Sequence, residues 1–283
     1  MDHREARCHD PGREQPERAQ RWAGQRPGQK TVGEHGQEPA LLECHRDDAE
    51  HGYRPGDEPR RGIVDRVRER KELVHPRVTV PRVTVRKSSY RSLASLQRDL
   101  ARCRACVEAG YPLESLPVRA PFAHQCAYMY GQAPGVVEGA ERLPWRGRAG
   151  QTLRRWLELD ERTFYATFYC ASVTRCYPGR APSGRGDRTP TPREQDLCEF
   201  WRTWELEVLR PRLIVTVGGL ALRRLLGLSQ LTESIGRRYE LHNVPVIPLP
   251  HPSGASGWLN LPAHRARLDV AVALVHDELT RLT

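Results

Sequence analysis

From residue 89 onward, the hydrophobic and polar positions follow two alternating patterns, one typical of helices and one typical of strands. Apolar residues spaced three or four apart predict helices. Short apolar runs rich in β-branched residues predict strands buried on both faces. The predicted order is helix 92–103, strand 126–130, helix 149–159, strand 167–173, helix 192–209, strand 213–217, helix 220–226, strand 244–249 and helix 262–282. This alternation predicts an α/β fold, a three-layer sandwich around a central, mostly parallel four-stranded sheet.

Residues 1–88 lack this patterning and form a separate segment. They hold 19 of the 45 Lys and Arg residues and 16 of the 35 Asp and Glu residues, but contain no Phe. Such a segment has too little apolar surface to offset the entropy of ordering it. We therefore expect either a disordered tail or translated sequence upstream of a start at Val78, Val80, Val83 or Val85. Residues 89–283 are expected to form the folded domain.

Charge and hydropathy limit the classes of function. The chain of 283 residues has a formal net charge of +10, which favours an anionic partner such as nucleic acid. It contains no run of 18 apolar residues, and its first thirty positions are charged throughout. A membrane span and a secretory signal are therefore not expected. The sequence predicts a cytoplasmic protein, most simply a monomer.

Unusual residues follow three of the predicted strands. The loops are Gly131-Gln132-Ala133-Pro134-Gly135, continuing to Trp145 and Gly150, then Ser172 to Pro178, and finally His251 to Asn260. In parallel α/β sheets the ligand site lies at the carboxyl ends of the strands. Glycines allow a ligand to approach the backbone, and Trp145 offers a flat face. These three loops are therefore the predicted binding site.

Four cysteines in the folded part indicate a metal centre. Cys103 and Cys106 form a Cys-x-x-Cys pair at the end of the first predicted helix, and Cys176 and Cys198 flank an arginine-rich loop. Four thiolates could hold a 4Fe-4S cluster or a tetrahedral zinc, and the spacing alone does not decide between them. Redox catalysis is a weaker hypothesis, because the pair is predicted at the end of a helix and not at its N-terminus, where the positive helix end would lower a thiol pKa.

Taken together and in order, these motifs resemble the uracil-DNA glycosylase superfamily and are most similar to its iron-sulfur family 4 branch. The resemblance covers about residues 92–282. It implies a DNA glycosylase that hydrolyses the N-glycosidic bond of uracil or another deaminated base in base excision repair. It also implies a 4Fe-4S cluster on Cys103, Cys106, Cys176 and Cys198, and damaged DNA as the partner.

The resemblance assigns roles to the loop residues. Gly131, Gln132, Ala133, Pro134 and Gly135 would enclose the base and position a water, with Gln132 and Ala133 next to the reaction. Trp145 would stack on the flipped base, Ser172 would contact its edge, and His251 would donate to the pyrimidine O2. Ser253 would grip a phosphate, and Trp258 or Leu259 would enter the base stack. Because arginines anchor phosphates, Arg175, with Arg180, Arg185 and Arg188, is a further predicted DNA contact.

Three departures from the family pattern, and the undecided metal on the four cysteines, keep two other functions open. Ser172 stands where family 4 usually has Asn, Gln132 where it usually has Glu, and Ala255 is too small to act as a wedge. A hydroxyl cannot supply the paired donor and acceptor of an amide. One alternative is a weak or inactive DNA-binding member of the same fold. The other is a zinc-stabilised nucleic-acid-binding protein.

Overall fold

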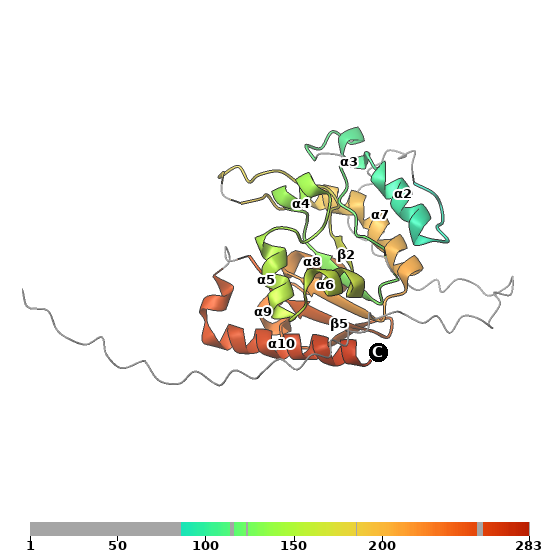
Figure 1. The fold of residues 1–283 in the computed structure, drawn as a ribbon. Helices are drawn as coiled ribbons and strands as arrows, with labels where there is room; N and C mark the ends of the chain where they lie inside the picture. The colour runs from blue at the N-terminus through green and yellow to red at the C-terminus, as the bar shows by residue number, and fades with distance from the viewer. Residues whose placement is uncertain (1–85, 114–115, 123, 185, 254–256, 283) are drawn as a thin grey trace, which may run out of the picture. The chain divides into compact units, whose positions relative to one another are not determined.

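The computed structural model describes residues 86–113, 116–122, 124–184, 186–253 and 257–282 (Figure 1). The prediction for residues 1–88 lies outside these residues, except for the last three positions. The helices and strands of the described part of the chain are α2 (Leu93–Ala101), α3 (Ala105–Glu108), β1 (Ala127–Gly131), α4 (Val136–Glu141), α5 (Arg148–Trp156), α6 (Glu161–Thr167), β2 (Phe168–Ser172), α7 (Pro192–Leu209), β3 (Leu213–Val217), α8 (Gly219–Leu226), α9 (Leu231–Ser234), β4 (Tyr239–Leu241), β5 (Val244–Leu249), η2 (Trp258–Asn260) and α10 (Pro262–Thr280). No described helix is long and apolar enough to cross a membrane.

The central sheet has the order β2-β1-β3-β5-β4. Strands β2, β1, β3 and β5 are parallel, and β4 pairs antiparallel with β5. The α/β class and the mostly parallel sheet are confirmed. The register aligns Gly131 with Ser172 at the ends of β1 and β2, so the loops after both strands start side by side.

The prediction of four strands was wrong by one. Strand β4 has three residues, too few to show a hydrophobic period, and it is not fully buried. The turn that follows it consists of His242 and Asn243, both with positive φ. Two such residues are typical of the tight turn of a β-hairpin. This turn was the missed signal for the extra strand.

Helices cover both faces of the sheet. On one face, Tyr128 and Tyr169 contact Glu205 of α7 through their hydroxyls, at 2.7 and 3.2 Å. Helix α2 packs on the outside of α7. On the opposite face, Phe168 packs against Phe164 of α6. Helix α10 also packs on β5 and β3. The N-cap residues Ser92 of α2 and Thr191 of α7 accept backbone hydrogen bonds at the starts of their helices.

A buried ion pair lies between the sheet and α7. The guanidinium of Arg175, which is 2% exposed, pairs with Glu205, which is 1% exposed. Tyr128 and Tyr169 complete the network by donating to the same carboxylate. The prediction that Arg175 contacts DNA was therefore wrong, because its side chain is enclosed by the core and its charge is already paired.

We predict that Glu205→Gln lowers the free energy of unfolding by about 3–5 kcal/mol, because it leaves the buried Arg175 charge uncompensated. Denaturant unfolding measures this loss. Glu207→Gln on the same helix is the matched control and should change the free energy by less than about 0.5 kcal/mol. Equal effects of the two substitutions would contradict the ion pair's role.

Candidate functional site

Three loops meet the sheet at the carboxyl ends of its parallel strands. Gln132 continues directly from β1, and its carbonyl accepts a hydrogen bond from Thr174 N at 3.3 Å. Val173 N likewise donates to Gly131 O at 2.9 Å. These bonds join the loops after β1 and β2 beyond the end of the sheet. The third loop begins at His251, two residues after β5 ends.

The indole of Trp145 lies against Gly131 and leaves no room for a side chain there. A Cβ on Gly131 would lie 2.8 Å from Trp145 Cζ2. Trp145 has a positive φ of 60°, and its carbonyl accepts from Arg154 Nη1 at 2.9 Å. A Cβ on Gly150 would lie 1.7 Å from the same carbonyl oxygen, so Gly150 is also required. The structure thus fixes an aromatic ring beside the end of β1.

The carboxylate of Glu138 binds both the glycine-rich loop and the segment that follows Trp145. Its Oε2 accepts from Gly135 N at 3.1 Å, and its Oε1 accepts from Gly147 N at 2.7 Å. The side chain is buried, and each of its oxygens holds one loop. Hydrogen bonds to a carboxylate are stronger than neutral ones. Glu138 therefore positions both the glycine-rich loop and the segment that follows Trp145.

His251 is held as a neutral donor. Ser253 N donates to His251 Nδ1 at 3.2 Å, and Ser253 Oγ lies 2.8 Å from the same nitrogen. A backbone N–H can only donate, so Nδ1 carries no hydrogen and the neutral ring has its hydrogen on Nε2. Burial lowers the pKa of His251, and the negative charge of Glu138 opposes this shift. The neutral form is thereby favoured near neutral pH.

The ring of His251 also packs on the end of β3. A Cβ on Gly218 would lie 3.5 Å from His251 Cβ and 3.6 Å from Cδ2. These are ordinary van der Waals distances, but Gly218 has a φ of 87°, which an L side chain rarely adopts, so its backbone conformation favours glycine. Gly218 and Ser253 together fix the position of the imidazole.

The hydroxyl of Ser172, at the end of β2, donates its proton within the protein. Its hydroxyl donates to Thr174 O at 2.7 Å, so the oxygen can only accept further hydrogen bonds. The side chain is half-buried and lies in register with Gly131, the residue under the Trp145 ring. Ser172 therefore presents an acceptor next to the aromatic ring.

The arginine-rich loop between Cys176 and α7 lies beside α4. Tyr177 Cβ would be 3.0 Å from a Cβ on Gly139, and Tyr177 Oη donates to Asp187 Oδ1 at 3.0 Å. Arg180 is exposed, whereas Arg188 makes two hydrogen bonds to Glu194 at 2.8 and 2.6 Å. Arg185 lies outside the described residues. Of the predicted arginine contacts, Arg180 is the one that the described loop leaves open to solvent.

The predicted DNA contacts in the loop after His251 are packed against the rest of the protein. Trp258 Nε1 donates to Thr232 Oγ1 at 2.9 Å, and the ring stacks on His264 at 4.3 Å between centroids. Leu259 packs partly on the core. Leu261, which the sequence reasoning missed, is 56% exposed. Ala255 lies outside the described residues. The structure thus holds the half-buried Trp258 through a hydrogen bond and a ring stack, and exposes Leu261.

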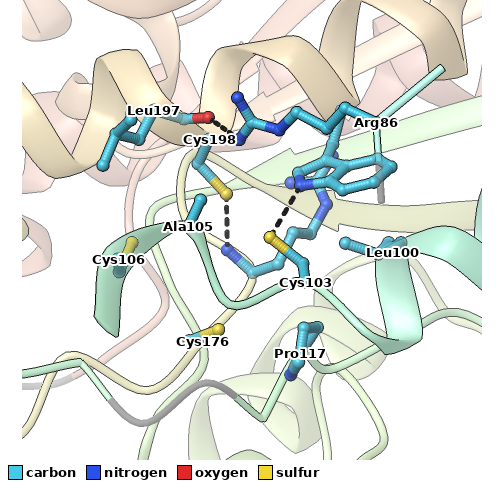
Figure 2. Close-up of a pocket in the computed structure, with 11 residues that line it drawn as sticks. Arg86, Leu100, Cys103, Ala105, Cys106, Pro117, Cys176, Leu197 and Cys198 are labelled. Atoms are coloured by element: carbon cyan, nitrogen blue, oxygen red, sulfur yellow. Dashed lines mark hydrogen bonds between the residues drawn. The ribbon is translucent and has the colours of Figure 1, made fainter. Parts of the chain in front are cut away.

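The four predicted metal ligands line a single pocket (Figure 2). Cys103, Cys106, Cys176 and Cys198 share it with Arg86, Arg175, Trp201 and apolar side chains. Two of the sulfurs accept hydrogen bonds: Trp201 Nε1 donates to Cys103 Sγ at 3.3 Å, and Arg175 N donates to Cys198 Sγ at 3.2 Å. Among the described side chains, no group of three or more His, Cys, Asp or Glu is arranged to hold a metal ion.

The cysteine thiols do not have the properties of a redox pair. Cys106 lies in the first turn of α3, so the expectation that the Cys-x-x-Cys pair only ends a helix was wrong. Burial, with smaller contributions from the neighbouring Cys198 and Cys103, nevertheless raises the pKa of Cys106 to about 12. Burial likewise raises the pKa of Cys198 to about 11, with Arg175 opposing. Free Cys106 and Cys198 thiols would be protonated and unreactive near neutral pH, which argues against redox catalysis.

Comparison with known proteins identifies the fold. The family model described as the uracil DNA glycosylase superfamily matches residues 126–269. A Type-4 uracil-DNA glycosylase from Thermotoga maritima is 31% identical over 126 residues, which cover 44% of this chain and 62% of that protein. One from Archaeoglobus fulgidus is 28% identical over 174 residues, or 57% of this chain and 82% of the relative. The chain thus spans a little under two thirds of the first relative.

We predict that Glu138→Gln lowers the free energy of unfolding by about 2 kcal/mol, because an amide can accept from only one of the two loop N–H groups. Denaturant unfolding tests this. Glu141→Gln on the same helix breaks a surface pair with Arg146 and should cost less than about 1 kcal/mol. If both variants lose the same small amount, Glu138 does not tie the loops together.

Proposed function

The chain belongs to the uracil DNA glycosylase superfamily, and from this premise we propose that it is a DNA glycosylase. It would hydrolyse the N-glycosidic bond of uracil or another deaminated base and leave an abasic site for base excision repair. The observation that carries the proposal is His251, which is held at the carboxyl edge of the sheet with its hydrogen on Nε2. The Type-4 uracil-DNA glycosylases among the relatives support the same activity.

The neutral imidazole suits the charge that develops in this reaction. The bond between the sugar C1′ and the base nitrogen breaks, and its electron pair leaves with the base. Water adds to C1′ and gives up a proton, and the base takes up one. A donor aimed at the carbonyl oxygen of the departing base stabilises its negative charge by several kcal/mol in a site that excludes water. His251 Nε2 would be that donor.

The base pocket would lie between Trp145 and the glycine-rich loop. The reacting base must leave the DNA stack, which costs a few kcal/mol, and stacking on an aromatic ring recovers part of that cost. The Trp145 ring over Gly131 supplies the flat face. Pro134 is buried, while Gln132 and Ala133 are half-buried. The Gln132 amide and the backbone carbonyls of this loop would hold the attacking water, because both oxygens of Glu138 already hold the loops.

Ser172 would select bases by its free lone pairs. Its proton is donated to Thr174 O, so its oxygen can accept from the ring N–H of uracil, hypoxanthine or xanthine. Cytosine presents a lone pair at the equivalent ring nitrogen, and two acceptors facing each other are unfavourable. Deaminated bases that carry a ring N–H are therefore the proposed substrate class.

The four buried cysteines fit a 4Fe-4S cluster, which would have a structural role. The fit rests on the donor set, four thiols around one pocket with N–H groups donating to two of the sulfurs. Such N–H groups are typical neighbours of cluster thiolates. The same four sulfurs could instead hold a tetrahedral zinc, and iron and sulfide analysis of the purified protein separates the two.

The second candidate is a DNA-binding member of the fold that cleaves slowly or not at all. It is favoured by Gln132, which cannot act as a general base, and by Glu138, whose two oxygens are already engaged. The formal net charge of +10 suits DNA binding in either case. Catalysis separates the two candidates, because both would bind DNA with an affinity that falls as salt rises.

We predict that the protein excises uracil from an oligonucleotide and that His251→Ala lowers the single-turnover rate by about 10²–10³-fold with little change in DNA affinity. Oligonucleotides with one uracil, hypoxanthine or xanthine, treated with alkali after reaction, measure excision. His242→Asn, at an exposed turn where Asn tolerates a positive φ, is the control. A folded protein that binds DNA but cleaves none of these substrates would support the second candidate.

We predict that Ser172→Asn raises the rate of uracil excision by about tenfold, because the amide adds a donor for the neighbouring carbonyl of the base. Ser172→Ala should lower the rate by a similar factor, since it removes the acceptor. Single-turnover rates on uracil give both values. Unchanged rates in both variants would remove Ser172 from base recognition.

A further inference from the structure

Two arginines that line the cysteine pocket carry buried guanidinium donors with no acceptor among the described residues. Arg86 and Arg175 both line the cysteine pocket. Arg86 Nε and Arg175 Nη1 are two of the four buried side-chain polar atoms that lack a partner among the described residues. An unpaired buried donor on a charged group is costly, so native proteins normally provide it with a partner.

Arg86 is held over the pocket from the segment that precedes α2. Its Nη2 donates to Leu197 O, and Figure 2 shows the side chain extending to that carbonyl next to Cys198. Its guanidinium lies 4.7 Å from the Phe200 ring centroid and 5.6 Å from that of Trp201. No carboxylate of the described part of the chain lies within ion-pair distance of Arg86. Its positive charge thus has aromatic neighbours but no anionic partner there.

Arg175 also lines the pocket. Its backbone N–H donates to Cys198 Sγ at 3.2 Å, while its side chain pairs with Glu205. The ion pair engages Nε and Nη2 and leaves Nη1 buried and unpaired. A neutral thiol is a weak acceptor, so protonated cysteines would not satisfy these donors.

We infer that Arg86 and Arg175 donate their free N–H groups to the sulfur atoms of an anionic iron-sulfur cluster and so hold it in the protein. This inference rests on the cluster proposed above. Four thiolates and the bridging sulfides carry net negative charge and supply acceptors on the cysteine side of the pocket. Arg86 would contribute the charge that the pocket otherwise lacks, and Arg175, already paired with Glu205, would contribute a directed donor. Both residues are positioning residues for the cluster.

The test compares full-length wild-type protein with Arg86→Gln, Arg86→Lys and Arg175→Lys. Arg86→Lys keeps a charge but removes the Nε–H, and Arg175→Lys keeps a cation for Glu205 but removes Nη1. Arg91→Gln, an exposed arginine of the same segment, is the control. The readouts are iron and sulfide content, the rate at which an iron chelator bleaches the visible absorption, and the reduction potential of the cluster.

We expect Arg86→Gln to bleach several-fold faster than wild type and to have a more negative reduction potential, because donors to sulfur stabilise the reduced cluster. The two Lys variants should bleach at intermediate rates, and Arg91→Gln should match wild type. A brown wild type with unchanged bleaching and potential in all three pocket variants would overturn this inference and leave the cluster intact. Zinc or no metal in the wild type would overturn both this inference and the proposed iron-sulfur cluster.

Discussion

The parallel register of the sheet is the constraint on which the site depends. Because β1, β2, β3 and β5 run in the same direction, their carboxyl ends meet at one edge, and the loops that follow them start there. Gly131 and Ser172 are aligned by this register, and Gly218 at the end of β3 supports His251. Residues that are far apart in the sequence are thereby brought together at one edge of the sheet. The chemistry is then set by a few hydrogen bonds that fix each loop.

Two opposing effects keep His251 suited to its proposed role. Burial lowers its pKa, and the charge of Glu138 raises it. The same Glu138 carboxylate holds Gly135 and Gly147, so the residue that balances the imidazole charge also positions the base pocket. The Ser253 backbone N–H, which every residue except proline would supply at that position, determines which ring nitrogen carries the hydrogen. Geometry and charge at the site therefore depend on the same short loops.

The sequence predicted the long elements because their signals are local. The helix 192–209 and the strands 213–217 and 244–249 have the bounds that the apolar runs and flanking Pro and Gly residues indicated. Long-range partners have no such signal. Arg175 was expected to contact DNA, but it forms a buried ion pair with Glu205, which lies thirty residues later in the sequence. The loop-tying role of Glu138 likewise depends on Gly147, which approaches it only after folding.

The protonation state of His251 is the central claim of the account, and ¹⁵N NMR of the histidine side chains tests it most directly. His251→Ala would assign the signal in the spectrum of the free protein. The account predicts a neutral ring at pH 7 with its hydrogen on Nε2, which gains a proton only below the ordinary histidine pKa of 6.5. A ring that is charged at pH 7, or that carries its hydrogen on Nδ1, would contradict it.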